Sequence, residues 1–458
     1  MRRASALLVA AFALGAAASV PARADLAITG VTLVDGRGGP PRPGVTVLVR
    51  GERVAAVGER LRPPRGVPRL DGRGRFLMPG LMDVHIHLVG AGQWRGLSNP
   101  PGVEIDEAAA REALRGYLYW GVTSVYDAGN DPRLSLALRA RERAGEIESP
   151  RIFASGHALS YPGSWMAGSF HGIGVPDWPA TQAVLDAQVA AQPDLQKIVI
   201  EGFGLGPNPA VPQLPAGLVQ KMVAYLHERG VRTTVHATTE ANARVAAAAG
   251  IDTFAHPVGT ARMSEPFVAQ LAAARKPIAT TLAVFDEIIR LGEDPGFLDA
   301  PLYSAVLSAD EIAARKAFGP PRYAALGWSA WFKALMPYYR ENVRRLAEAG
   351  AVLAVATDRS DGATLHRELE LLAEAGLPGA QIVTMATLNG ARFLGREAEL
   401  GSVEPGKLAD LLLLDADPTA DVQHLRRIVA VVKGGRVVAR QRLDLPVNRR
   451  PAPVAPNH

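Results

Sequence analysis

The stretch LMDVHIH at residues 81–87 ends an apolar run on two histidines, His85 and His87. A short unbroken apolar run predicts a buried β-strand. Side chains two positions apart on a strand point to the same face, so both imidazoles could reach one metal ion from the interior of the fold. Alone, the pair is weak evidence, because two histidines on one strand face are about as often ordinary polar residues. Its meaning depends on whether other strands end in the same way.

Other strand-like runs in the middle of the chain do follow this pattern. Together with residues 81–87 they give eight candidate strands, which end near His87, Asp127, Gly156, Glu201, His236, His256, Thr281 and Asp358. Helical patterns lie between several of them, at Glu107–Trp120, Leu218–Arg229, Glu240–Ala249 and Arg340–Ala349. Alternating strands and helices are typical of βα units around a parallel sheet. We therefore predict an α/β fold, a (β/α)8 TIM barrel, over residues 81–399.

Short β-rich runs broken by Gly and Pro lie on both sides of this barrel segment. Runs of this kind are typical of strands in a small sheet. We expect residues 25–80 and 400–445 to form one small β-sandwich domain from both chain ends. Residues 446–458, rich in Pro and Asn, are predicted to be a tail.

The interval 285–340, between the seventh and eighth barrel strands, is too long for a simple connection. It contains several helical turns and the aromatic residues Trp328, Trp331, Tyr338 and Tyr339. We predict an insertion with its own structure. It could form a lid or wall over the pocket, or it could be a dimer contact or an extra packing layer.

The first 24 residues read as a secretory signal peptide. Arg2 and Arg3 precede an apolar run that extends to about Ala18, and Ala24 closes an A-x-A cleavage pattern. The alternative, a membrane anchor, is disfavoured because the run is shorter than the ~20 residues that a spanning helix needs. We expect a secreted or periplasmic protein after cleavage near Ala24.

The charge of the chain argues against a nucleic-acid partner. Residues 1–24 hold three arginines and no acid, so their removal lowers the formal net charge from +5 to +2. No basic run is interleaved with aromatic residues, and no later segment is long enough to span a membrane. We expect a small-molecule or small-peptide substrate, with a homo-oligomer left open.

The chain contains no Cys. It can therefore form no disulfide, and no thiolate can act as a nucleophile or metal ligand. Any metal site must use His, carboxylate or a modified Lys.

Four of the ten histidines end predicted strands, on the rim where barrel enzymes build their sites. They are His85, His87, His236 and His256. Asp358 ends another long apolar run, where an unpaired carboxylate would be costly. As a metal ligand its charge would be compensated, although an Asp in this position can also cap the following helix.

Four collinear motifs extend this pattern over nearly the whole mature chain. They are MPGLMDVHIH at 78–87, GVTSVYDAG at 121–129, ATLNGA at 386–391 and GSVEPGKLADL at 401–411. In this respect the chain resembles the amidohydrolase superfamily, and within it the imidazolonepropionase-like and Xaa-Pro dipeptidase-like group. The resemblance implies a metal-dependent hydrolase with one or two divalent ions, Zn or else Mn, Fe or Co.

The resemblance also assigns ligand positions. It implies metal ligands at His85, His87, His236, His256 and Asp358. In members with two metals a Lys on the fourth strand is carboxylated, and Lys197 occupies that place. A buried Lys favours its neutral amine, which can react with carbon dioxide to give a carbamate.

Glu201 complicates this assignment. A buried Lys197 ammonium paired with Glu201 is the alternative to carboxylation. Glu201-Gly202-Phe203-Gly204 also departs from the Gly-Gly pair that many relatives have after this strand. Glu201 could itself be a ligand or could orient one.

The ligand types imply metal-activated attack by water on an amide, cyclic amide or peptide bond. Asp358 would accept the proton of the water and then deliver it to the leaving nitrogen. His236 and His256 would bind a second metal, or one of them would stabilise an oxyanion. His157 and Tyr161, which follow the third strand, are weaker candidates for substrate contacts.

Two other functions remain possible from the sequence. One is a mononuclear-metal deaminase of the same superfamily, for which Glu240 would be the additional acid, although Glu240 more simply opens a helix. The other is a non-catalytic exported binding protein. The complete set of metal ligands argues against a binding protein, because a receptor does not need the full set.

Overall fold

A computed structural model describes residues 25–449, apart from residues 89–105, 165, 170 and 203–209. The predicted signal peptide, residues 1–24, lies outside the described residues, as do residues 450–458 of the predicted tail. No helix in the described part is both long and apolar enough to cross a membrane.

Eight parallel strands of the described chain form the barrel, as predicted. They are β6 (Leu81–Ile86), β7 (Val122–Asp127), β8 (Arg151–Ala154), β11 (Gln196–Val199), β12 (Thr233–His236), β13 (Thr253–Phe254), β14 (Ile278–Ala279) and β15 (Leu353–Ala354). The first three pair in one sheet, and the last five pair in another in chain order. Backbone hydrogen bonds from Val84 N to Val355 O and from Asp358 N to His85 O join β6 to the segment after β15.

Two short strands, β9 (Ala158–Ser160) and β10 (Gly172–Gly174), follow β8 and extend the second sheet beyond β11. The bond from Asp194 N to Ala154 O links β8 to the start of β11. The barrel is therefore closed on one side through β6 and β15 and on the other through the region of β8, β9 and β11.

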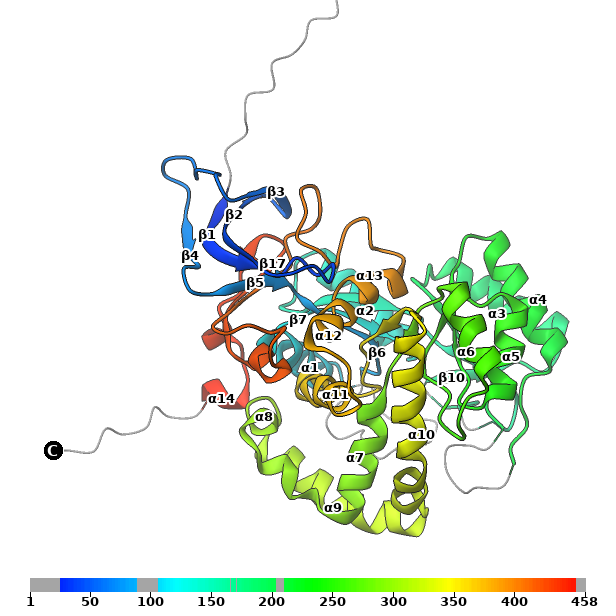
Figure 1. Cartoon of the computed structure of the whole chain (residues 1–458). Coiled ribbons are helices and arrows are strands. Elements are labelled where there is room, and N and C mark those ends of the chain that lie inside the picture. Colours follow the sequence, from blue (N-terminus) through cyan, green and yellow to red (C-terminus); the bar gives the residue numbers. More distant parts are fainter. Residues whose placement is uncertain (1–24, 89–105, 165, 170, 203–209, 450–458) are drawn as a thin grey trace, which may run out of the picture.

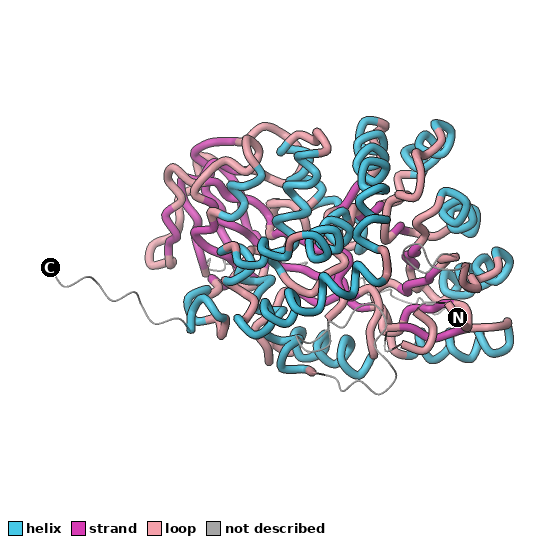
Figure 2. The backbone as a smooth tube through the Cα atoms, turned by 90° about the horizontal axis from the view of Figure 1, so that it is seen from below, coloured by secondary structure: helices cyan, strands magenta, loops and turns pink. Residues whose placement is uncertain are grey.

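Helices connect the strands and cover the barrel (Figures 1 and 2). They include α1 (Glu107–Tyr119), α2 (Pro132–Arg143), α3 (Trp178–Ala190), α4 (Ala216–Glu228), α5 (Glu240–Ala249), α6 (Glu265–Ala274), α11 (Gly362–Glu374), α12 (Gly379–Met385) and α13 (Leu388–Leu394). Five of them begin after a side chain that accepts a backbone N–H of the first turn, which stabilises that end. These residues are Asp106, Asp131, Asp177, Thr239 and Asp361.

The connection from β14 to β15 consists of α7 (Leu282–Glu293), a 3-10 turn (Pro295–Asp299), α8 (Pro301–Ser304), α9 (Ala309–Ala325) and α10 (Trp328–Glu348). These helices project from the barrel as a group in Figure 1. The predicted helix at 340–349 in fact begins at Trp328 and continues through Pro337. Proline usually ends or kinks a helix, but here Trp328, Phe332 and Tyr339 are buried on one face, and that packing outweighs the lost hydrogen bond.

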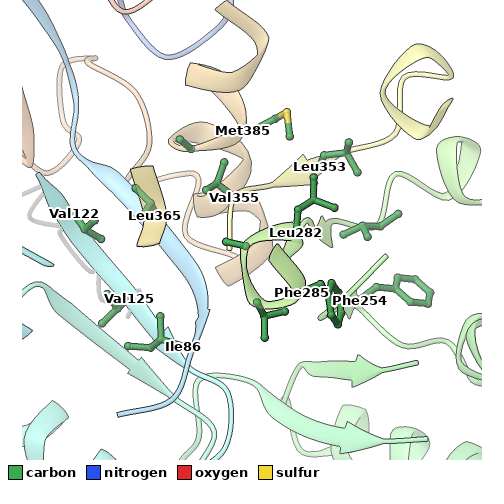
Figure 3. Close-up of a cluster of buried hydrophobic side chains, with 14 of the residues drawn as sticks. Ile86, Val122, Val125, Phe254, Leu282, Phe285, Leu353, Val355, Leu365 and Met385 are labelled. Carbon is green, nitrogen blue, oxygen red and sulfur yellow. The ribbon is translucent and has the colours of Figure 1, made fainter. Parts of the chain in front are cut away.

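The main core lies between the barrel strands and these helices (Figure 3). Its labelled members include Ile86 and Val125 from the strands and Phe285 from α7, all nearly inaccessible to solvent. The ring of Phe285 stacks on Phe332 and Tyr339, at centroid distances of 4.8 and 4.2 Å. The helices after β14 are thus joined to the barrel by a continuous aromatic layer.

The two ends of the chain build one β-rich domain, as predicted. Its strands are β1 (Leu26–Leu33), β2 (Arg42–Arg50), β3 (Arg53–Gly58), β4 (Arg69–Asp71), β5 (Phe76–Pro79), β16 (Leu411–Leu414), β17 (Ile428–Lys433) and β18 (Arg436–Val437). They pair in the order β18-β17-β16-β5-β1-β2-β3, with β4 on β1. Residues 446–449 form a short helix, α14, and Val447 N donates to Ala305 O.

Candidate active site

The carboxyl ends of the barrel strands bring the predicted ligands together. The ring centroid of His85 lies 5.3 Å from that of His87 and 4.7 Å from that of His256. The rings of His236 and His256 are 4.5 Å apart. Asp358 lies beside three of these rings, with Oδ1 3.2 Å from His87 Nε2 and Oδ2 3.9 Å from His256 Nε2.

The backbone fixes the orientation of the first two imidazoles. Nδ1 of His85 lies 2.9 Å from the carbonyl of Ala255, and Nδ1 of His87 lies 2.8 Å from the carbonyl of Gly129. A carbonyl oxygen only accepts, so each Nδ1 carries the proton and donates it. In the neutral ring each Nε2 then carries the lone pair, and this is the form of histidine that binds a metal ion.

The charge states agree with this arrangement. Burial, followed by the nearby charge of Lys197, holds the pKa of His85 well below its usual range, and burial together with His236 does the same for His256. Burial opposes ionisation of Asp358, but the surrounding imidazoles outweigh it and hold the pKa of Asp358 well below its usual range. The shifts therefore favour the neutral form of His85 and His256 and the ionised form of Asp358.

This arrangement fits a bound cation. Within the described chain, Asp358 Oδ1 is buried and receives no hydrogen bond, although His87 Nε2 lies 3.2 Å away. Two lone pairs that face each other repel unless a positive charge lies between them. Ligand atoms of His85, His256 and Asp358 all lie within 4.8 Å of one another, so these residues could hold a metal ion.

Lys197 lies at the same centre, on β11. Its side chain is buried, and Nζ is 3.2 Å from Nε2 of His85. Burial lowers the pKa of Lys197 from 10.5 to about 7, although Asp358 opposes the shift. A substantial fraction of the amine is therefore neutral near pH 7.

His236 is oriented by a different partner. Its Nε2 lies 3.1 Å from a carboxylate oxygen of Glu201, which also accepts a hydrogen bond of 2.7 Å from the hydroxyl of Thr238. All three side chains are buried. Glu201 thus contacts a predicted ligand directly, as expected if it orients one.

The weaker candidates are not joined to this cluster by any contact of their side chains in the part of the chain that the structure describes. His157 and Tyr161 are partly buried, and within the described residues their side chains form no hydrogen bond with the five strand-end ligands. His171 is closer, because its ring lies 4.9 Å from that of His87 and its Nδ1 donates to the Gly129 carbonyl that also accepts from His87. Burial lowers the pKa of His171 to about 3.

The sequence assigned no role at the site to two supporting residues, Thr281 and Asp83. Thr281 at the start of α7 has its hydroxyl 2.9 Å from Nδ1 of His256. Asp83 accepts hydrogen bonds from the backbone N–H groups of His85 and Thr357 and from the Thr357 hydroxyl, at 2.7 to 3.3 Å. Asp83 was detectable as an acid within an apolar run, but Thr281 carries no such signal.

Glu240 opens α5, where its carboxylate accepts from the backbone and hydroxyl of Ser264 and from Arg244. The simpler interpretation of this residue, a helix-opening acid, therefore agrees with its place in the structure. Its carboxylate oxygens are already engaged at the surface end of the helix.

The fold and the site together define a (β/α)8 barrel protein with a histidine and carboxylate centre at the carboxyl ends of its strands. The Amidohydrolase family model matches residues 76–438. The chain belongs to the amidohydrolase family, and it is a hydrolase that acts on carbon–nitrogen bonds of small-molecule substrates.

Individual relatives agree with this classification. The chain is 30% identical to an imidazolonepropionase of Rubrobacter xylanophilus over 438 residues, which cover 85% of this chain and 90% of the relative. Among solved structures, phenylurea hydrolase B is 25% identical with a TM-score of 0.73, over 93% of this chain and all of that one. A Xaa-Pro dipeptidase with methionine in its active site shares the fold, with a TM-score of 0.72 at 20% identity over 90% of this chain and 99% of that one.

Proposed function

We propose that the chain is a metal-dependent amidohydrolase in which Asp358 carries the proton from water to the leaving nitrogen. The observation that carries this proposal is the buried Asp358 carboxylate, which faces the Nε2 lone pairs of His85 and His87. A structural carboxylate in this position would need donors, and both histidines direct their donors elsewhere. The arrangement is suited to a cation and a proton acceptor.

The metal site proposed here uses the ligands at the strand ends. His85, His87 and Asp358 would hold one divalent ion, Zn²⁺ in the first instance, and His236 and His256 a second. When bound, such an ion polarises a carbonyl and lowers the pKa of water to near neutrality. A non-catalytic binding protein would have no use for the proton-carrying carboxylate.

Asp358 supplies the acid–base chemistry. As an ionised group it accepts one proton of the attacking water while the new carbon–oxygen bond forms. It then returns that proton to the nitrogen as the carbon–nitrogen bond breaks, so the products are an amine and a carboxylic acid, which loses its remaining proton to solvent. The side chain of Asp358 is only 10% exposed, which limits the access of bulk water that would otherwise take up the proton.

Lys197 is proposed to carry a carbamate that bridges two metals. The neutral amine attacks carbon dioxide, a nitrogen–carbon bond forms, and one proton is released to solvent. Its lowered pKa and its distance of 3.2 Å from His85 support this proposal. A bare Lys197 would leave a mononuclear centre, for which the deaminase alternative should be tested by ammonia release.

The closing experiment uses purified, metal-analysed protein. A panel of cyclic amides, Xaa-Pro dipeptides, N-acyl amino acids and phenylureas is assayed before and after chelation, and again after addition of Zn²⁺ or Mn²⁺. We expect hydrolysis of at least one class, loss on chelation and recovery on reloading. Ligand binding by calorimetry without any turnover would favour the binding protein and overturn the proposal.

We also propose that the protein is exported. Asp25, the first residue after the predicted cleavage site, is held in the terminal sheet, because Asp25 N donates to Val49 O and the Asp25 carboxylate accepts from Gly51 N. Cleavage after Ala24 would leave this first contact intact. The mass of the protein from a periplasmic fraction should correspond to a start at Asp25, whereas an intact Met1 would contradict export by cleavage.

A further inference from the structure

The residue after the proposed proton carrier, Arg359, is held by a buried network of ion pairs. Arg359 Nε lies 2.6 Å from the carboxylate of Glu287 on α7. A second arginine, Arg315 on α9, lies 3.5 Å from Glu287 and 3.0 Å from Asp361. Each of these four side chains is at most 7% exposed, and they come from three separate segments of the chain.

Asp358 needs such support because of its backbone. Its φ angle is +54°, in the left-handed region that non-glycine residues seldom adopt. Such a conformation persists only where the surroundings hold it in place. On the barrel side, Asp358 N donates to His85 O. On the other side the restraints act through Arg359.

Arg359 is restrained in both its main chain and its side chain. Its carbonyl accepts from the Tyr117 hydroxyl at 3.0 Å, and its guanidinium donates to Val284 O, also at 3.0 Å. The pair with Glu287 adds the charged restraint. Since the Asp358 side chain direction follows from its φ angle, a shift of Arg359 would turn the carboxylate away from the histidines.

Helix α7 supports the centre at a second point. It begins after Thr281, another non-glycine residue with positive φ, at +41°. The Thr281 hydroxyl lies 2.9 Å from Nδ1 of His256. The same helix therefore contacts the His256 ligand at its start and reaches the Asp358 segment one and a half turns later through Glu287.

We propose that Glu287 is a positioning residue, which fixes the orientation of Asp358 through its ion pair with Arg359. Helix α7 and its continuation into α9 would then serve the reaction as a rigid support for the metal ligands. This inference rests on the proposed function, since it assigns to Glu287 a role toward the proposed proton carrier and ligand. The charged partners of Glu287 in the described chain are Arg359 and Arg315, so it would act on the centre through Arg359.

The test compares Glu287→Gln with Glu293→Gln. Both changes remove one carboxylate charge from α7, but Glu293 pairs only at the surface, with Lys333 at 2.8 Å. The first readout is binding of Co²⁺ alone, followed by its visible absorption, which reports ligand geometry. We expect Glu287→Gln to weaken Co²⁺ binding about tenfold or more and to change the spectrum, because lost support of a ligand typically costs 10–100-fold. Glu293→Gln should match the wild type.

The second readout is the split between kcat and KM on the best substrate of the amide panel. A misplaced proton carrier should lower kcat about 10–100-fold and leave KM within about twofold. Glu287→Asp keeps the negative charge but has a side chain shorter by one methylene, so the charge lies farther from Arg359. Its kcat should lie between those of the wild type and Glu287→Gln. It also keeps the test valid if Glu287→Gln does not fold.

Two outcomes would overturn the inference: a wild-type Co²⁺ spectrum and kcat in both Glu287 variants, or equal losses in Glu293→Gln. Asp358→Asn separates this result from failure of the proposed function. If Asp358→Asn keeps full turnover, the proton-carrier assignment fails, and the Co²⁺ spectrum still tests the support of the ligand. If Asp358→Asn is inactive and Glu287→Gln is normal, only the positioning role is wrong.

Discussion

The core of the terminal sheet (β1–β5 and β16–β18) and the site layer of the barrel (His85, Lys197, His236, His256 and Asp358) are both largely buried, but their side chains are of opposite kinds. The sheet core consists of aliphatic residues such as Val47, Leu77 and Leu413, each with no exposed surface. The site layer contains imidazoles, an amine and a carboxylate. Burial stabilises the first kind and is unfavourable for the second without compensation.

The two regions also differ in backbone conformation, because strained φ angles of non-glycine residues occur at the site. The site layer and its immediate support include Asp358 and Thr281, two non-glycine residues with positive φ. In the terminal sheet, the described residues with positive φ are all glycines, such as Gly30 and Gly51. The comparison teaches that the sheet provides stability, whereas the site layer gives up stability in return for ligand groups held in fixed orientations.

The largest effect is expected for Asp358→Asn. Asparagine keeps the size of the side chain and one oxygen ligand, but it cannot accept the proton of water. We expect kcat to fall by about 10³-fold, equivalent to about 4 kcal/mol of transition-state stabilisation. Metal content, measured on the same preparation, should change little. An unchanged kcat would contradict the role of Asp358 as proton carrier and, with it, the contrast in function between the site layer and the terminal sheet.

The next effect is expected in the sheet. Leu413→Ala removes a side chain with no exposed surface from the core of β16 and should lower the free energy of unfolding by about 3 kcal/mol. Denaturant titration measures the loss, and kcat per folded molecule should stay at the wild-type value. Val437→Ala, at a position that is 50% exposed on β18, is the control and should change stability by less than about 0.5 kcal/mol. A fall in kcat for Leu413→Ala would contradict the division of roles.

Lys197→Met should move activity and stability in opposite directions. Loss of the carbamate should lower the metal content from two ions to one and kcat by about 100-fold, or about 2.7 kcal/mol. In the metal-free protein the same change replaces a buried amine by an apolar group and should raise the melting temperature. Metal analysis and calorimetry provide the two measurements. A stable variant with two metals would remove Lys197 from the ligand set.

The smallest effect is a pH dependence of stability in metal-free protein. The pKa of Lys197 is about 7 in the folded chain and near 10.5 when unfolded, so between these values the unfolded chain binds the extra proton. Stability should therefore rise between about pH 7 and 10.5, be lost progressively as pH falls through this window, and level off below 7, with a slope of at most about 1.4 kcal/mol per pH unit. Urea titrations at pH 7, 8 and 9 measure the slope. Lys197→Met should lack this component, and an equal slope in both proteins would refute the assignment.

The helices after β14 share features with both regions, because they bury aromatic side chains as well as charged ones. Their aromatic residues Phe285, Phe332 and Tyr339 form a stacked, buried layer like a structural core. Glu287 and Arg315 bury charges beside that layer, as the site does. Of the interpretations open from the sequence, a packing layer fits these aromatic residues, and the ion pairs tie that layer to the site.

Much of the barrel could be predicted because each strand is a short apolar run that ends on a polar residue. The predicted ends at His87, Asp127 and His236 fall within one residue of the observed ends of β6, β7 and β12. Prediction was poorer for α10, where Pro337 masked a helix that begins at Trp328. Local rules for proline apply to an isolated segment, whereas the aromatic packing that overrides them involves residues from α7.

The sequence by itself determined which groups the site contains. The histidines, Lys197 and Asp358 are recognisable because they end or interrupt apolar runs, and strand alternation places His85 and His87 on one face. These are properties of neighbouring residues. Their interpretation as one site still depended on the other strand ends and, for Lys197, on the resemblance to the amidohydrolase superfamily.

Only the tertiary structure decided how those groups are held. The partner of His85 Nδ1 is the carbonyl of Ala255, 170 positions away, and Asp358 owes its left-handed backbone to restraints from β6, α1 and α7. Which nitrogen carries a proton, and where a carboxylate points, depend on hydrogen bonds a few ångströms long between segments that are distant in sequence. No local pattern encodes such contacts, because they exist only once the barrel has closed.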